Sequence, residues 1–159
     1  MEKNNKEGNL IISLDFEKFW GVAESKKIED YYRNLISVDK VIVRLLDKFE
    51  EYNIKATFAI VGFMLFNDIK DIIKFNLDNN IKSKLDYALL ESYSNCLFVD
   101  KDLIERILFN GHELASHTFS HNYILDNSNK DTGNIIQEDI NNYINYFTVL
   151  ELITNRNVF

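Results

Sequence analysis

The chain has 159 residues, of which 46% are hydrophobic and 27% are charged, which suits one packed domain rather than two. The formal net charge of −7 at pH 7 argues against binding to nucleic acid or to an anionic membrane, because both surfaces require clustered basic residues. The single cysteine, Cys96, excludes an internal disulfide and is expected to be a small, half-buried side chain. A polar amino terminus and the lack of a long apolar stretch favour a cytoplasmic protein.

The first half of the chain shows the pattern of a strand, a helix and a second strand. Residues 10–15 are mostly apolar and predict a buried strand. Apolar residues over 38–49 recur at helical spacing, with Ser37 as the expected N-terminal cap and Asn53 as the end. Residues 55–61, KATFAIV, are apolar and β-branched and indicate a second buried strand. A strand, a helix and a strand joined by short turns predict a parallel pair.

The second half continues with helices, a strand and a last helix. Residues 65–73 indicate a helix, whereas residues 76–95 are polar and read as a long excursion of the kind that decorates a binding face. Asp100 is expected to cap the next helix. Residues 113–116 predict a third strand, and the apolar spacing over 136–150 predicts a final amphipathic helix. The order predicts an α/β fold of parallel strands with flanking helices, whose active site lies at the carboxyl ends of the strands.

All three histidines lie within residues 111–121, GHELASHTFSH. His117 and His121 are four residues apart, which places two side chains on one face of a helical turn, where both imidazoles can reach one metal ion. Asp15 and Glu17 follow the first predicted strand as these histidines follow the third, so the four side chains should meet. Two imidazoles and one carboxylate leave a position for water, the pattern of a catalytic zinc site. The alternative is an accidental pair of histidines on a solvated surface.

These segments resemble the motifs of the polysaccharide deacetylase family, the NodB-like carbohydrate esterases. SLDFE at 13–17 looks like the family's first motif, GHELASHTFSH at 111–121 looks like its second, and KATFAIVG at 55–62 looks like the strand between them. The resemblance covers residues 10–158 and implies a partial (β/α) barrel, because a closed barrel needs at least about 200 residues. We therefore expect one domain over 1–159 that is truncated at its C-terminus and lacks the family's last strands. A partial barrel exposes a sheet edge, so self-association is expected.

The resemblance also implies roles for individual residues. It makes Asp15 the catalytic base, and Glu17, His117 and His121 the ligands of a divalent metal ion, for which zinc is the expected choice. Glu17 departs from the family pattern, in which this ligand is usually aspartate. The implied activity is that of a metal-dependent hydrolase that removes N-acetyl groups from a polysaccharide or amino sugar, with carbohydrate as its substrate. The family's later histidine, which acts as general acid, has no match in this sequence.

Three aromatic residues near the motifs have less specific interpretations. His112 precedes the third strand and is expected at the opposite end of the sheet, in a structural or solvated role. Trp20 and Tyr123 each lie just past a motif and are candidates for stacking on a sugar ring, although packing of the loops against the domain explains them equally well. Two other functions stay open. The chain is either a catalytically inactive remnant that binds a metal or a glycan, or an unrelated zinc hydrolase with the same ligand triad.

Overall fold

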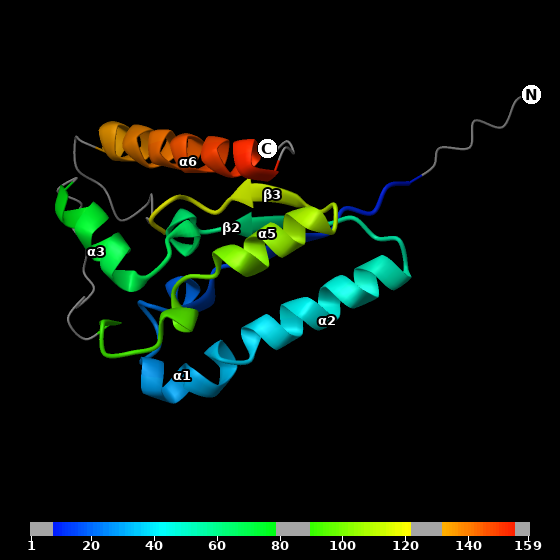
Figure 1. Ribbon diagram of the computed structural model, residues 1–159, viewed down its shortest axis with the longest axis horizontal. Coiled ribbons are helices and arrows are strands. Elements are labelled where there is room, and N and C mark those ends of the chain that lie inside the picture. Colours follow the sequence, from blue (N-terminus) through cyan, green and yellow to red (C-terminus); the bar gives the residue numbers. More distant parts are fainter. Residues whose placement is uncertain (1–7, 79–89, 122–131, 155–159) are drawn as a thin grey trace, which may run out of the picture.

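A three-stranded parallel sheet forms the centre of the computed structural model, which describes residues 8–78, 90–121 and 132–154 (Figure 1). The strands are β1 (Ser13–Phe16), β2 (Thr57–Ile60) and β3 (Glu113–Ser116), in the order β1-β2-β3. Ser13 pairs with Thr57, and Thr57 pairs with Glu113. The three strands therefore share one register, and their carboxyl ends lie at the same edge of the sheet. The predicted α/β class of parallel strands with flanking helices is confirmed, and the open sheet is consistent with the expected partial (β/α) barrel.

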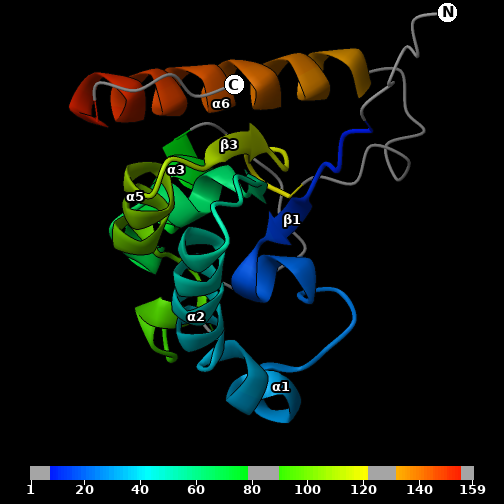
Figure 2. The ribbon, with the colours of Figure 1, turned by 90° about the vertical axis from the view of Figure 1, so that its right-hand side faces the viewer.

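Helices and short 3-10 turns connect the strands. The helices are α1 (Ile28–Leu35), α2 (Val38–Glu51), α3 (Ile69–Asp78), α5 (Lys101–Phe109) and α6 (Thr132–Thr154). The 3-10 turns are η1 (Lys18–Gly21), η2 (Gly62–Leu65) and η3 (Asn95–Leu97). Figures 1 and 2 both show α6 along the β3 side of the molecule, with α1 and α2 on the opposite side. Within the described part of the chain, no helix has the length and apolarity needed to cross a bilayer.

Side chains alternate between the two faces of the sheet, as they must in extended strands. Phe58 and Leu114 lie side by side in register and are both 0% exposed, which places them on the face that packs against the helices. The next row holds Asp15, Ala59 and Ala115 on the opposite face. The side chain of Asp15 is 60% exposed, so this second face is open to solvent at β1.

The first strand begins later than predicted. Leu10 and Ile11 are 88% and 83% exposed, and β1 starts only at Ser13. The reason is the neighbouring strand, since β2 begins at Thr57 and the Thr57 N–H already bonds to the Ile12 carbonyl. Without a partner strand, the apolar character of residues 10–11 does not produce buried β-structure.

Local sequence sets some helix ends as expected. Oδ1 of Asp100 accepts a hydrogen bond from the Leu103 N–H at 3.3 Å, which confirms the predicted cap of α5. Asn53 has a left-handed φ of 51° just after α2, which confirms the predicted end. Ser37 occupies the predicted N-cap position of α2, but its side chain makes no capping hydrogen bond. Helix α1, which was not predicted, ends immediately before it, and the Ser37 hydroxyl donates back to the Arg33 carbonyl at 2.7 Å.

Candidate metal centre

Glu17, His117 and His121 come together at the carboxyl edge of the sheet. Oε2 of Glu17 lies 3.0 Å from Nε2 of His117 and 3.0 Å from Nε2 of His121. The three ligand atoms all lie within 4.8 Å of one another. Two donors that each bind a tetrahedral zinc at about 2 Å lie about 3.3 Å apart, so the two distances of 3.0 Å from Glu17 are close to the spacing that one ion requires. Two imidazoles and a carboxylate are also a donor set that zinc uses in catalytic sites.

The segment that carries the two histidines is not the helical turn expected from their spacing. Residues 117–121 are irregular, and both Thr118 (φ 64°) and His121 (φ 56°) have left-handed backbone conformations. The segment instead continues past the end of β3 as a loop, with the His117 N–H bonded to the Ile60 carbonyl of β2 at 2.9 Å. The predicted meeting of the two imidazoles is nevertheless observed, with ring centroids 5.5 Å apart.

Hydrogen bonding favours the ionised form of the Glu17 carboxylate. The hydrogen bond with His121 is the main cause that lowers the pKa of Glu17, and the nearby charge of His117 acts in the same direction, whereas burial opposes both. Glu17 is therefore ionised at neutral pH. An ionised carboxylate is the form that binds a divalent metal ion.

Asp15 lies beside the triad, on the solvent-facing row of the sheet. Its Oδ1 is 3.7 Å from Nδ1 of His117, on the opposite side of that ring from Glu17. This separation is longer than a hydrogen bond. The carboxylate of Asp15 thus lies next to His117, and it is exposed to solvent.

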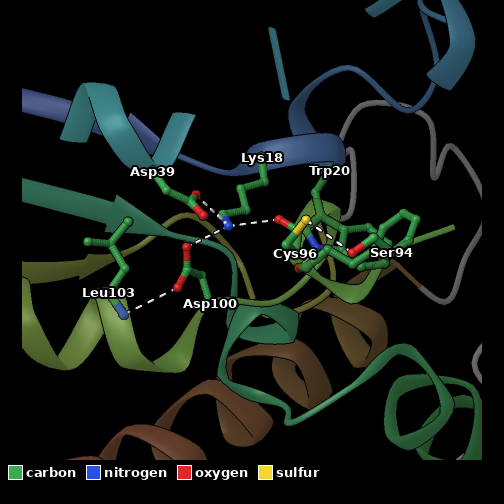
Figure 3. Close-up of polar contacts among 8 residues, drawn as sticks. Lys18, Trp20, Asp39, Ser94, Cys96, Asp100 and Leu103 are labelled. Atoms are coloured by element: carbon green, nitrogen blue, oxygen red, sulfur yellow. Dashed lines mark hydrogen bonds and ion pairs between the residues drawn. The ribbon is translucent and has the colours of Figure 1, made fainter. Parts of the chain in front are cut away.

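A buried lysine anchors the turn that carries Glu17 (Figure 3). Nζ of Lys18 lies 2.8 Å from Oδ1 of Asp39 and 2.5 Å from Oδ2 of Asp100, and it donates to the Cys96 carbonyl at 2.8 Å. The side chain of Lys18 is 1% exposed, and its backbone φ is 45°. These contacts fix η1 against the first turns of α2 and α5. Cys96 contributes its carbonyl, while its side chain is exposed rather than half-buried as predicted.

Trp20 is buried beside the Lys18 contacts and is not exposed for stacking on a sugar ring. Its side chain is 2% exposed, and its indole N–H donates to the Phe98 carbonyl at 2.8 Å. The indole also packs edge-on against Phe63, with centroids 5.2 Å apart. Of the two interpretations that the sequence left open, the structure supports packing, because both the ring faces and the N–H are used inside the protein. Tyr123, the other stacking candidate, lies outside the described residues.

His112 lies away from the triad, at the amino end of β3, as predicted. It is 5% exposed, and its Nδ1 accepts a hydrogen bond from the Ala56 N–H at 3.2 Å. Its ring packs against Phe49 and Phe58, with both centroids 5.4 Å away. Burial lowers the pKa of His112, so the imidazole is neutral at pH 7. Its role is structural.

Sequence reasoning missed the residues that hold the site in place. The sequence patterns gave no role to Lys18 or to Gly21. The signal that could have indicated Gly21 is its position four residues after Glu17, at the end of a turn that brings position 21 back onto the carboxylate. No comparable signal marked Lys18, because its partners Asp39 and Asp100 are distant in the sequence.

Comparison with known proteins identifies the family. A family model described as polysaccharide deacetylase matches residues 28–150, which is more than half of the chain. Comparison with curated proteins and with solved structures gave no significant match. The matched range includes His117 and His121, whereas Asp15 and Glu17 precede it. The contacts of Glu17 with the two histidines therefore connect the first motif to the second independently of the family model. The chain belongs to the polysaccharide deacetylase family.

Proposed function

We propose that this protein is a metal-dependent hydrolase that removes N-acetyl groups from a polysaccharide or an amino sugar. Family membership supports a carbohydrate deacetylase. The main observation in support of a metal site is the position of the Glu17 carboxylate. Its Oε2 lies 3.0 Å from Nε2 of both His117 and His121. Glu17 and His121 are 104 residues apart in the sequence. In this proposal these three residues hold a divalent ion, and zinc is the metal that the donor set favours.

In this proposal Asp15 is the general base. Zinc held by three protein ligands lowers the pKa of a bound water to about 7 and polarises a carbonyl group. The carboxylate of Asp15 stands next to His117 and is 60% exposed, so it can accept a proton from a water that attacks the amide carbonyl of the substrate. Glu17, His117 and His121 would hold the ion that polarises the attacked carbonyl. Hydrolysis then releases acetate and leaves an amine on the sugar.

A second candidate function is binding of a metal or a glycan without turnover. The leaving amine must take up a proton, and the remaining histidine of this sequence, His112, is buried and hydrogen-bonded at the far end of β3. It cannot protonate a leaving group at the candidate centre. Metal binding does not require this proton, so it can occur without turnover.

The first experiment compares zinc binding by the parent protein with that of Glu17→Gln, His117→Ala and the control Glu50→Gln, whose side chain is exposed on α2. We expect one zinc per chain in the parent and the control, and loss of stoichiometric binding in the other two variants. A parent protein that binds no zinc would contradict the metal site. Acetate release from an N-acetylated amino-sugar oligomer, compared with an O-acetylated one, then separates the two functions. Metal binding without acetate release supports the second candidate, and preference for the O-ester rules out the N-deacetylase.

A further inference from the structure

An aspartate from the last helix reaches the loop that carries the two histidines. Asp139 lies in α6 and is 8% exposed. Its Oδ2 accepts a hydrogen bond from the Phe119 N–H at 2.7 Å. Its Oδ1 accepts two more, from the Ser120 N–H at 3.0 Å and from the Ser120 hydroxyl at 2.7 Å. A single carboxylate thus binds three donors of the segment between His117 and His121.

The conformation of this loop requires support from outside. Thr118 and His121 both have left-handed φ values, of 64° and 56°, which residues with a side chain rarely adopt. Such conformations persist where the surrounding structure determines them. Because His121 is itself one of the left-handed residues, relaxation of the loop would turn its imidazole away from Glu17.

Support comes from two opposite sides. The Gly62 and Phe63 N–H groups of η2 bond to the carbonyl groups of Thr118 and Phe119, at 3.1 Å and 2.9 Å. On the other side of the same segment, the Asp139 carboxylate accepts hydrogen bonds from the Phe119 and Ser120 N–H groups. The Phe119 ring is 0% exposed and packs against Tyr146 of α6, with centroids 5.0 Å apart. The loop is therefore fixed between η2 and α6.

We infer that Asp139 is a positioning residue of the metal centre, whose carboxylate holds the 117–121 loop in the conformation that directs both imidazoles at Glu17. This inference rests on the proposed metal site. The negative charge is part of the role, because hydrogen bonds to an ionised acceptor are shorter and stronger than those to a neutral one. An asparagine at position 139 would have the same shape, but its NH₂ group would face one of the loop's donors.

The test compares Asp139→Asn with Glu138→Gln, which removes an equal charge from the exposed neighbouring position of the same helix. Three properties are measured, namely zinc affinity by chelator competition, the visible absorption spectrum of the Co²⁺-substituted protein, and hydrogen exchange of the Phe119 and Ser120 amides in metal-free protein. For Asp139→Asn we expect zinc affinity to fall by about 10-fold to 100-fold, the range for residues that orient metal ligands. We also expect an altered Co²⁺ spectrum and faster exchange at both amides. Glu138→Gln should match the parent in all three.

The outcomes distinguish this inference from the proposed function. If the parent binds neither zinc nor Co²⁺, the metal site is wrong, and amide exchange alone decides whether Asp139 fixes the loop. If Asp139→Asn keeps the parental affinity, spectrum and amide exchange, the inference is overturned. If Asp139→Asn does not fold, Ser120→Ala takes its place, because it removes the hydroxyl donor to the same carboxylate. A weaker zinc affinity with an altered Co²⁺ spectrum in Ser120→Ala supports the inference, and parental values overturn it.

Discussion

The backbone of Gly21 leaves no space for a side chain beside Glu17. A Cβ atom at position 21 would lie 2.7 Å from Cγ of Glu17 and closer still to its carboxylate. The neighbouring atoms belong to a flexible side chain, so an added methyl group would displace the carboxylate rather than the backbone. Gly21 therefore decides where the carboxylate of the candidate metal centre lies.

Gly21→Ala should weaken metal binding without unfolding the protein. We expect zinc affinity to fall by about 10-fold or more, since the Glu17 ligand is pushed aside. The free energy of unfolding should change by less than about 1 kcal/mol, because alanine at a compatible backbone position mainly restricts the unfolded chain. Zinc titration and urea unfolding measure the two quantities. The matched control is Gly133→Ala, where no atom lies within 4 Å of the added Cβ, and equal zinc affinities in the two variants would contradict the prediction.

Asp15→Asn should separate catalysis from metal binding. If Asp15 is the general base, kcat for deacetylation falls by about 100-fold or more while zinc affinity stays within about threefold of the parent. The 3.7 Å separation between Asp15 and Nδ1 of His117 allows another role, in which the carboxylate orients the histidine. That role would lower the zinc affinity itself. Steady-state kinetics and zinc titration on the same preparations decide between the two.

Removal of the Lys18 charge should destabilise the fold. Lys18→Met leaves Asp100 facing Asp39 without their shared cation, and breaking a buried ion pair costs about 3 to 5 kcal/mol. We expect about 3 kcal/mol, because the side chain of Asp39 is 44% exposed and can turn towards water. Lys48→Met is the control, since its ion pair with Glu51 is exposed and should contribute less than about 1 kcal/mol. Urea unfolding measures both, and a loss in Lys18→Met no larger than in the control would show that the cluster does not stabilise η1.

His112 should make the stability depend on pH in a specific window. Burial lowers the pKa of His112 from its usual value of 6.5, so the unfolded chain binds the proton more readily than the folded protein. The contribution of the neutral imidazole is then fully present above about pH 6.5 and declines as the pH falls towards the lowered pKa. His112→Asn keeps an acceptor near the Ala56 N–H but does not titrate. The difference in unfolding free energy between parent and variant should shrink on acidification from pH 7.5 to 5.5, whereas a constant difference would refute the assignment.

The outer edge of β1 should allow two copies of the chain to associate. Within the described residues no strand pairs with that edge, and Leu10 and Ile11 extend it as exposed apolar side chains. Unpaired edges with apolar flanks favour strand-to-strand contact between molecules. Light scattering should detect a mass above that of the monomer as concentration rises, and Ile11→Lys should reduce it. A parent that stays monomeric over the same concentrations would be evidence against association at this edge.

Several elements could be predicted because residues close together in the sequence determine them. The third strand lies at the predicted residues, and Asp100 caps α5, since alternation and a capping side chain act over a few neighbouring residues. The start of β1 and the conformation of 117–121 could not be predicted in this way. The start of β1 depends on pairing with β2. The conformation of 117–121 depends on hydrogen bonds with β2, η2 and Asp139, all of which are distant in the sequence.

The sequence by itself determined which side chains make up the candidate site. Carboxylates after one strand and histidines after another, both parallel, predict their meeting at one edge of the sheet, and that meeting is observed for Glu17, His117 and His121. Only the tertiary structure decided how those side chains are held. The supports are Gly21, the buried Lys18 and Asp139, and each acts through contacts that spacing along the chain does not encode. The physical reason is that a ligand set follows from chain order, whereas its position to within an ångström depends on packing between distant segments.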